Sequence, residues 1–591
     1  MCGGVYHHVV IFTTRNNYLL SPHHCQFLMK KICTISGQEF EITEADIKVY
    51  DRLGLPTPTL CPDERNRRRM CWRNDRVFYK RKCDLTGQSI VSIYQENTPF
   101  PVYEHKAWWG DKWDAMDYGV DFDFSRPFFE QFQELMNKVP RRSMDLTNCE
   151  NSDYSNFCGD DKNCYLDIAG EANEDCYYNL FTKYSKNCAD NTFVYNSELV
   201  FESINCYNCF DVRSSMYLEN CNGCDFCYDC KGCADSVFCW NLRRKTNCIF
   251  NEQFSKEEFE KKKKELRLDS HKHFEMYREK FFEMLKNDAL HKNMMILNSE
   301  NCEGNNMNHC KNTHFAFNVS HCEDASFLYD VLEATDCRDL NYSLYKPEAS
   351  VELISTLNMK FCLCSMATHF SHELAYCDHC ENSHDMFGCV GINQGKFCIL
   401  NKQYTEEEYK ALREKIVEHM KGAHSTLPTS RDRSGSEQIS EWGEFFPASI
   451  SPHAYNETVA QEYFPLTKEE VLARGLRWKE PDKREFKAQS FVLPDTLKEA
   501  DDTVCDEVLV CEKTGKNYKI IPQELAFYRK MNVALPRLCP DQRHIERMKL
   551  RPGRELYERT CPHCSTKMKT VFAPDRKEKI WCEKCFVDEV N

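Results

Sequence analysis

The stretch CNGCDFCYDCKGC, residues 221–233, places a cysteine at every third position. The same spacing extends over residues 149–248, where every gap between neighbouring cysteines is a multiple of three. An α-helix repeats about every 3.6 residues and a flat strand every second residue, so neither gives this pattern. A coil of short strands does, because each short face of every turn points one small side chain inward. We therefore predict a cysteine-rich, short-rung β-solenoid over residues 149–254.

Rungs of twelve residues align the inward positions into columns. One such column reads Ser152, Cys164, Cys176, Cys188, Val200, Val212, Cys224, Ser236 and Cys248. Asn or Asp often precedes a cysteine, as stacked turns favour. In period only, the pattern resembles the twelve-residue β-solenoid of insect antifreeze proteins, but the Thr-x-Thr array that binds ice in that family is missing. A hexapeptide-type helix with longer rungs is the structural alternative.

The dense run at residues 221–233 would, by itself, suggest an iron–sulfur or multi-zinc site. Its positions, however, continue a register that begins about seventy residues earlier, where no cluster can be proposed. Inward cysteines in a narrow, dry core act as small hydrophobic side chains. We favour core packing over metal binding here, and also at Cys377 and Cys380.

The cysteine block is duplicated. At an offset of 150 residues, Cys227, Cys230, Cys239 and Cys248 match Cys377, Cys380, Cys389 and Cys398. This predicts a second solenoid over residues 301–404, with an insertion near 344–355 that explains a slip in register. Capping boxes at Ser255–Glu258 and Thr405–Glu408 predict a charged helix within 255–300 and another helix over 405–425.

A second duplication joins the two ends of the chain. At a constant offset of 478 residues, LCPD at 60–63 recurs at 538–541, within more than fifty residues aligned without a gap. In the later module, residues 506–591, the motif C-x2-C-x17-C-x2-C is the spacing of a four-thiolate zinc ribbon. We predict that Cys561, Cys564, Cys582 and Cys585 bind a structural Zn²⁺. A closed tetrahedral site of this kind stabilises and does not catalyse.

The earlier module, residues 29–110, is a degenerate zinc ribbon. Thr86, Glu104 and Ala107 stand where the later copy has its second, third and fourth cysteines. An alternative site would use Cys33, Cys61, Cys71 and Cys83. Their spacing fits no standard pattern, and we slightly favour buried free thiols.

The segment 65–82 carries nine basic residues and one acid, in a chain of net charge −15. Its helical spacing and interleaved aromatics suit phosphate contacts and base stacking, which predicts nucleic-acid binding, with RNA favoured over DNA. The alternative is a helix whose arginines pair with acids elsewhere in the protein. The predicted binding residues are Arg65, Arg67, Arg68, Arg69, Arg73, Arg76, Lys80 and Arg81.

The remaining segments connect or cover these units. Residues 1–28 lack signal-peptide features. Because they match nothing later in the chain, and Met29 is a plausible start, we expect them to be a disordered extension or one wrongly joined to the chain. The aromatic segment 111–148 is predicted to cap the open first rung of the first solenoid. Residues 426–505 are predicted to form a linker with a short helix that docks through Trp442, Phe445 and Phe446. No run of eighteen apolar residues exists, so no membrane span is expected. Thirty-seven cysteines without an export signal favour thiols and metal sites over disulfides.

The order of these units, with LCPDERNRRR at 60–69, CDLTG at 83–87 and YFPLTKEEVLARGLRW at 463–478, resembles a cysteine-rich, zinc-ribbon-flanked family of ultrasmall candidate-phylum bacteria. The resemblance covers about residues 29–591 and implies a cytoplasmic bacterial protein. That family has no assigned activity, so the resemblance implies none.

The sequence as a whole predicts a mainly β protein with some α, in which two solenoids are flanked by duplicated zinc modules with basic helices. We expect a non-enzymatic scaffold that presents these modules to a structured RNA, such as that of the ribosome. One alternative is a metal-storage or thiol redox-buffer protein, and another is a protein–protein interaction scaffold. The sequence contains no recognisable catalytic triad, phosphate loop or open metal site, so we expect no enzyme.

Overall fold

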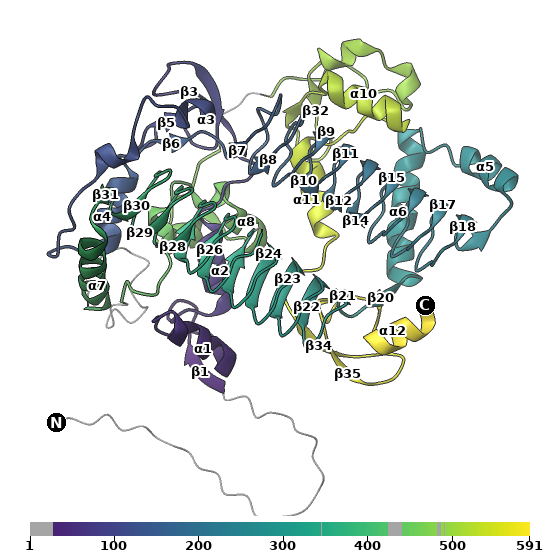
Figure 1. Cartoon of the computed structure of the whole chain (residues 1–591). Helices are drawn as coiled ribbons and strands as arrows, with labels where there is room; N and C mark the ends of the chain where they lie inside the picture. The colour runs from purple at the N-terminus through teal and green to yellow at the C-terminus, as the bar shows by residue number, and fades with distance from the viewer. Residues whose placement is uncertain (1–27, 344, 423–439, 482–485, 490, 591) are drawn as a thin grey trace, which may run out of the picture.

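Large parallel sheets dominate this mixed α/β chain (Figure 1). The computed structural model describes residues 28–343, 345–422, 440–481, 486–489 and 491–590. Our prediction for residues 1–28 falls outside this part of the chain, except for Leu28, which begins the first strand. No helix in the described ranges is long and apolar enough to cross a membrane.

The first cysteine block, residues 146–253, pairs strands that lie twelve residues apart in the chain. Lys186, for example, pairs with Glu174 on one side and with Glu198 on the other. One sheet has three strands and another has eight. The strands are β7 (Leu146–Thr147), β8 (Cys158–Gly159), β9 (Glu174–Tyr177), β10 (Leu180–Lys183), β11 (Lys186–Ala189), β12 (Thr192–Tyr195), β13 (Glu198–Phe201), β14 (Ile204–Tyr207), β15 (Phe210–Arg213), β16 (Asn222–Asp225), β17 (Ala234–Val237), β18 (Thr246–Ile249) and β19 (Glu252–Gln253).

The second cysteine block, residues 296–403, forms an eleven-stranded sheet in chain order. Its pairing offset is again mostly twelve, but Arg338 pairs with Val351, an offset of thirteen. The extra residue lies between Asn341 and Glu348, which overlaps the predicted insertion. The strands are β21 (Ile296–Leu297), β22 (Glu303–Asn308), β23 (His314–Ser320), β24 (Ser326–Leu332), β25 (Arg338–Asn341), β26 (Val351–Ile354), β27 (Leu363–Met366), β28 (His372–Ala375), β29 (His384–Phe387), β30 (Lys396–Ile399) and β31 (Lys402–Gln403).

The period of three has a backbone cause. In both blocks the residue before an inward position repeatedly has a positive φ near 50°, and these residues recur at intervals of three. Asn163, Asp175 and Asn187 are examples, with φ of 53°, 54° and 52°. Asn and Asp tolerate this left-handed conformation better than most residues, which explains their abundance before the cysteines.

The duplication of the blocks extends to their last residues. Cys248 pairs antiparallel with Gln253, and Cys398 pairs in the same way with Gln403. The predicted capping box at Ser255 is confirmed, and the chain continues into α5 (Lys256–Glu265) and α6 (His271–Asn287). After the second block, α7 (Glu406–Gly422) begins at the matching Thr405.

The N-terminal module consists of short hairpins and helices. Its elements are β1 (Leu28–Ile32), β2 (Glu39–Thr43), α1 (Glu44–Arg52), α2 (Pro62–Met70), β3 (Tyr79–Lys82), β4 (Ser89–Ser92), β5 (Val102–Tyr103) and α3 (His105–Trp108). It is followed by α4 (Phe128–Met136) and β6 (Arg141–Arg142).

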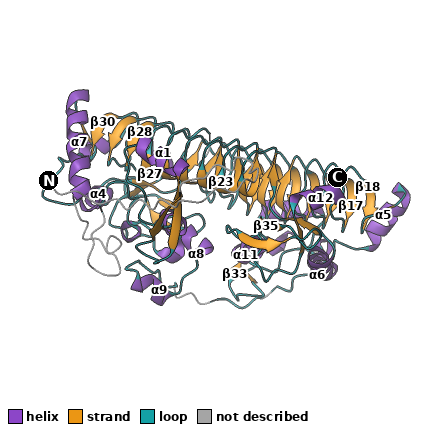
Figure 2. Cartoon of the chain, turned by 90° about the horizontal axis from the view of Figure 1, so that it is seen from below, coloured by secondary structure: helices purple, strands orange, loops and turns teal. Residues whose placement is uncertain are grey.

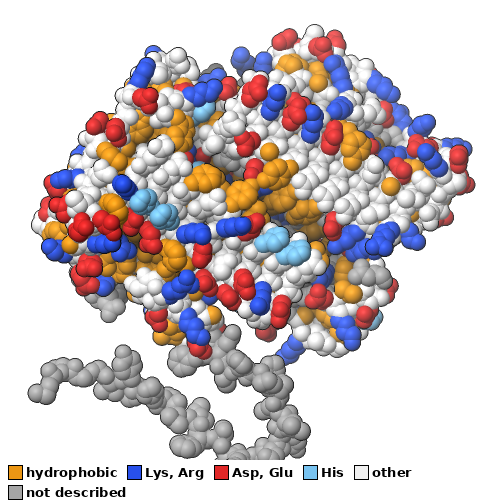
Figure 3. Space-filling model, in the orientation of Figure 1, with side chains coloured by type: hydrophobic (Ala, Val, Ile, Leu, Met, Phe, Trp, Pro, Cys, Tyr) orange, Lys and Arg blue, Asp and Glu red, His pale blue; other side chains and the backbone are white. Residues whose placement is uncertain are grey.

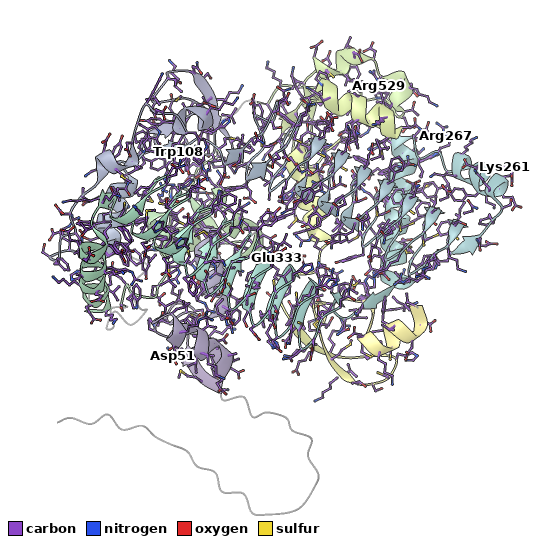
Figure 4. The ribbon with its side chains drawn as sticks, viewed as in Figure 1. Asp51, Trp108, Lys261, Arg267, Glu333 and Arg529 are labelled. Carbon is purple, nitrogen blue, oxygen red and sulfur yellow. The ribbon has the colours of Figure 1, made fainter. Side chains whose placement is uncertain are left out.

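The C-terminal module repeats this plan. Its elements are β32 (Leu509–Val510), β33 (Asn517–Tyr518), α10 (Pro522–Met531), α11 (Pro540–Lys549), β34 (Tyr557–Thr560), β35 (Lys567–Thr570), β36 (Lys579–Trp581) and α12 (Glu583–Val590). The equivalent residues Asp51 and Arg529 lie on opposite sides of the molecule (Figure 4), so the two modules cover different parts of the surface.

The aromatic segment before the first block caps a different surface from the one we predicted. Phe128 of α4 contacts Tyr376 and Phe387 of the second block, with ring centroids 5.2 and 5.4 Å apart. The backbone N–H of Val120 donates to the carbonyl oxygen of Leu400 at 3.1 Å. The segment therefore covers the end of the second block, because the chain crosses to that block before it enters the first one.

Residues between the second block and the C-terminal module dock as predicted. Phe446 stacks on Phe132 with ring centroids 4.6 Å apart, and Trp442 and Phe445 are buried. This region contains α8 (Val459–Tyr463) and α9 (Lys468–Ala473). Figure 2 shows α6, α8, α9 and α11 along one side of the strands of the two blocks.

Candidate metal centre

The four predicted cysteine ligands of the C-terminal module come together. Cys561 and Cys564 lie in the turn between β34 and β35, while Cys582 and Cys585 lie at the start of α12. Their Sγ atoms all lie within 4.8 Å of one another, and Cys564 Sγ is 3.6 Å from Cys582 Sγ. Four thiols at this separation can hold one metal ion.

Backbone N–H groups donate hydrogen bonds to Cys561 in this turn. Ser565 has φ 61°, which closes the turn so that its N–H donates to the Cys561 carbonyl at 2.9 Å. The N–H of Cys582 donates to Cys561 Sγ at 3.4 Å. The Thr566 side chain, followed by its backbone N–H, lowers the pKa of the exposed Cys564 to about 6. Burial raises the pKa of Cys582, which is the opposite shift from that of Cys564.

This cysteine set is fastened to the second block. The strand β20 (Leu290–Lys292), which leads into that block, pairs in parallel with β36. Lys569 Nζ lies 2.8 Å from a carboxylate oxygen of Glu303 at the start of β22. Cys561 and Cys585 pack in one cluster with Phe317 of β23. A metal ion here would therefore stiffen the join between the module and the block.

The alternative set of Cys33, Cys61, Cys71 and Cys83 does not assemble. Cys33 and Cys61 share one small hydrophobic cluster, Cys71 lies in another, and Cys83 packs beside Trp108 in a third. All four are buried free thiols. This corrects the predicted alternative metal site. Helix α2 separates Cys71 from Cys61, and the hairpin β3–β4 places Cys83 in a third cluster.

In the turns that begin at Cys33 and Cys511, a hydroxyl group stands where a second cysteine would complete a C-x2-C knuckle. Ser36 Oγ lies 3.7 Å from Cys61 Sγ, and Thr514 Oγ1 lies 3.9 Å from Cys539 Sγ. Glu104, in the place of a third cysteine, accepts a hydrogen bond from the N–H of Ala107 at 2.9 Å and caps α3. Hydrogen bonds therefore hold these turns where the C-terminal knuckle has thiols.

The predicted basic face is buried, which corrects its interpretation as an exposed nucleic-acid grip. Arg65 Nε lies 2.9 Å from Asp339 Oδ2, and Arg69 Nη1 lies 2.7 Å from Glu352 Oε2. The other buried arginines also have acidic partners: Arg67 with Glu64, Arg73 with Asp75 and Arg81 with Asp84, while the largely buried Arg68 contacts Glu352 and Glu444. The acids Asp339 and Glu352 belong to the second block, on which this helix docks, whereas the pairs with Glu64, Asp75 and Asp84 lie within the N-terminal module.

Among the predicted binding residues, Lys80 is exposed. Arg76 is half-buried, and both of its terminal guanidinium nitrogens are buried. On the face shown in Figure 3, Lys and Arg side chains are interspersed with Asp and Glu. The surface charge on this face is therefore mixed.

The inward thiols of the first block behave like serine hydroxyls. Cys227 Sγ lies 3.4 Å from the carbonyl oxygens of Asp225 and Ser236, two residues before and nine after it. Ser215 Oγ donates to the carbonyl of Arg213 in the same way at 2.8 Å. Within the described ranges, no set of ligand atoms close enough for one ion comes from residues 221–233. These contacts agree with core packing.

A second potential ligand group lies inside the first block and was missed by our sequence analysis. Cys158, Asp161 and Asp167 are buried, and one ligand atom from each lies within 4.8 Å of the others. All three occupy inward positions of the three-residue register. The signal was present in the sequence, because two ionisable side chains stand there among Cys, Ser and Asn.

No protein-family model and no curated protein matches the chain. Among solved structures, one neighbour is a crystal structure of a proposed acetyltransferase from Desulfovibrio desulfuricans G20. It has 11% sequence identity and a TM-score of 0.10, and the match covers 44% of this chain and 71% of that chain. Similarity at this level carries no argument about activity. The resemblance to the bacterial family and the cytoplasmic location stay predictions.

Proposed function

We propose that the chain is a non-enzymatic architectural protein: two β-solenoids, clamped by two knuckle modules and locked by a structural Zn²⁺. One observation carries this proposal. Arg65 of the N-terminal module meets Asp339 of the second block, and the equivalent Arg543 meets Asp190 of the first block at 2.9 Å. The same buried clamp is used twice, which suits a protein selected for a rigid shape.

The strand register supports rungs of twelve residues. Offsets of twelve recur in the sheets and also in isolated bridges at other corners of the first block, such as Glu150 with Lys162 and Asn156 with Ile168. A coil whose turns have four short faces stacks every face on the next turn. Its hydrogen-bond partners should therefore lie at the same offset on each side.

The four-cysteine group supports zinc. Zn²⁺ accepts four thiolates at tetrahedral positions, and a closed set of this kind has no open position for a substrate. The exposed Cys564 gives the ion a route in from solvent. The zinc would therefore act as a cross-link between the hairpin β34–β35 and α12.

A protein is the class of partner that we favour. The arginines that would grip RNA are used inside the molecule, and the net charge of −15 repels phosphate backbones. Metal storage is less well supported, because the inward thiols already contact backbone carbonyls.

Elemental analysis and an RNA-binding assay together test this proposal. We expect one or two zinc ions per chain, no iron, and no saturable change in fluorescence anisotropy when the protein is added to a labelled RNA hairpin at about 0.15 M salt. Stoichiometric iron or many metal ions per chain would favour storage. Saturable, salt-sensitive binding would favour RNA.

RNA binding is the second candidate, and one observation favours it. Two buried guanidinium nitrogens of Arg76 have no hydrogen-bond partner within the described residues. Arg76 lines a cavity of about 670 Å³ that contains Arg551 and Arg554 as well as the acids Asp63, Asp75 and Glu462. If RNA binds here, Arg76→Glu combined with Lys80→Glu will abolish binding, whereas the exposed control Lys498→Glu will not.

A further inference from the structure

In the inward columns of the first block, uncharged Asn side chains repeat the same pair of hydrogen bonds to the backbone. Asn191 Nδ2 donates to the carbonyl of Val200 at 2.8 Å, and its Oδ1 accepts from the N–H of Ser203 at 2.9 Å. Asn173 repeats both bonds with Thr182 and Ser185, at 2.6 and 3.1 Å. Each Asn therefore supplies a donor to the carbonyl nine residues ahead and an acceptor to the N–H twelve residues ahead.

Asp161 and Asp167 occupy the same two columns one repeat earlier, twelve residues before Asn173 and Asn179. Asp161 Oδ1 accepts from the N–H of Asn173 at 3.0 Å, and Asp167 Oδ2 accepts from Asn173 Nδ2 at 2.8 Å. An ionised carboxylate has no donor for the carbonyl ahead of it. Asp161 Oδ2 and Asp167 Oδ1 have no hydrogen-bond partner within the described ranges, although the two residues are only 1% and 0% exposed.

Gly170 leaves room between these carboxylates. A Cβ atom at Gly170 would lie 2.6 Å from Asp167 Oδ2 and 2.7 Å from Asp161 Oδ2. Both distances are too short for a side chain, so the two carboxylates converge on the place that a side chain would take. Cys158 stands twelve residues before Gly170 in the same column, and its Sγ accepts the Gly170 N–H at 3.3 Å. Thr182 follows twelve residues after Gly170, and its buried Oγ1 also has no partner among the described residues.

We propose that Cys158, Asp161 and Asp167 bind a divalent metal ion of the zinc class inside the first solenoid, separate from the four-cysteine site, with the Thr182 hydroxyl next to it. Thiolate sulfur and carboxylate oxygen are both ordinary Zn²⁺ ligands. Ligand atoms within 4.8 Å of one another can all reach one ion, because its bonds to them are about 2.0 to 2.3 Å long.

Binding exchanges protons for the ion. The Cys158 thiol lies 3.1 Å from the carbonyl oxygen of Asp167, and its proton is released when the sulfur becomes a ligand, together with the proton that the two carboxyls share without an ion. Two carboxylates and one thiolate then surround the divalent cation, which offsets most of their charge. Because all three ligands are buried, the ion is taken up during folding and exchanges slowly.

The full-length protein, refolded with Zn²⁺ alone, tests the inference by metal counting. We expect two zinc ions per chain: one released quickly to a chelator from the site with the exposed Cys564, and one released slowly. Cys564→Ser should remove the fast ion, and Asp161→Asn combined with Asp167→Asn should remove the slow ion.

Two further variants separate ligand loss from loss of folding. Cys158→Ser should also lose the slow ion, because the hydroxyl is a poorer ligand while it fits an inward position, as Ser215 does. Cys206→Ser is the matched control, since Cys206 is a buried thiol of the same column, 48 residues further on, and it should keep both ions.

Only one zinc per chain in the unmodified protein, or a slow ion that survives the Asp and Cys158 variants, would overturn the site. The two carboxyls would then share a proton. These outcomes leave the four-cysteine site and the architectural proposal untouched.

Discussion

Arg65 on α2 and Asp339 on β25 are 274 residues apart in the chain, yet they form an ion pair with Nε 2.9 Å from Oδ2. Both side chains are buried, and the Arg65 guanidinium also lies over the ring of Phe327, 5.1 Å from its centroid. This contact joins the N-terminal module to the second block.

The same arrangement joins the C-terminal module to the first block. Arg543, the equivalent of Arg65 at the 478-residue offset, pairs with Asp190 and lies over the ring of Tyr178, 4.6 Å from its centroid. Asp190 precedes Asp339 by 149 residues, and Tyr178 precedes Phe327 by the same number. The duplicated unit is therefore a module together with the surface on which it docks.

Removal of either buried carboxylate should destabilise the fold. Asp190→Asn leaves Arg547 without its acidic partner and Arg543 with Glu524 only. A buried charge without its partner costs about 3–5 kcal/mol, and we expect this loss in the free energy of unfolding in urea. Asp339→Asn should cost less, because Glu352 still faces Arg65 and Arg69.

Asp336→Asn is the control for these variants. Asp336 pairs with Arg52 at 2.6 Å, but both side chains are partly exposed, so the loss should be below about 1 kcal/mol. Equal effects of the exposed and buried variants would contradict the clamp.

Loss of a knuckle thiol should loosen one end of the molecule only. Cys582→Ser should release one zinc ion and raise hydrogen exchange over residues 557–590, because the ion joins β34–β35 to α12. Exchange in the cores of the two blocks should not change. Cys505→Ser, at a partly exposed thiol outside the group, should affect neither quantity. Unchanged zinc content in Cys582→Ser would rule out this site.

His453 should make the fold sensitive to acid. Burial, followed by the charges of Arg141 and Arg477, lowers the pKa of His453 to about 3. Its ring stacks on Tyr94 with centroids 5.1 Å apart. Because the unfolded chain binds this proton near pH 6.5 and the folded chain does not, stability should fall as the pH drops from about 6.5 towards 3, by up to about 1.4 kcal/mol per pH unit.

His453→Phe keeps a ring at this position and removes the proton site. Urea unfolding at several pH values should give the variant a flatter stability profile in that window. Parallel profiles for the two proteins would show that His453 is not the cause.

Replacement of an inward Asn should destabilise the first block more than replacement of an inward thiol. Asn191→Leu removes the side-chain partner of the Val200 carbonyl and of the Ser203 N–H in a dry core, at a cost of about 1–3 kcal/mol for each group left unpaired. Cys188→Ser should cost less, because a hydroxyl can donate to the Lys186 carbonyl, which lies 3.4 Å from the present sulfur. Thermal unfolding of the two variants measures the difference, and a larger loss in Cys188→Ser would argue for a special role of the thiols.

The sequence by itself determined the features that depend on local geometry. The three-residue register predicted the inward positions, and the Asn and Asp residues before them adopt the positive φ that the register needs. The spacing of Cys561, Cys564, Cys582 and Cys585 predicted a group that the structure brings together. Such patterns are readable because each residue's role is set by neighbours a fixed number of positions away.

Only the tertiary structure decided what the charged side chains do. A helix rich in arginine has the same sequence whether it faces water, RNA or a buried Asp339, because the partner is 274 residues away. The aromatic segment before the first block covers the second one for the same reason. Asp161 and Asp167 stood in the register all along, but the space at Gly170 between them exists only when successive repeats are stacked. Long-range docking fixes these roles, and no local pattern encodes it.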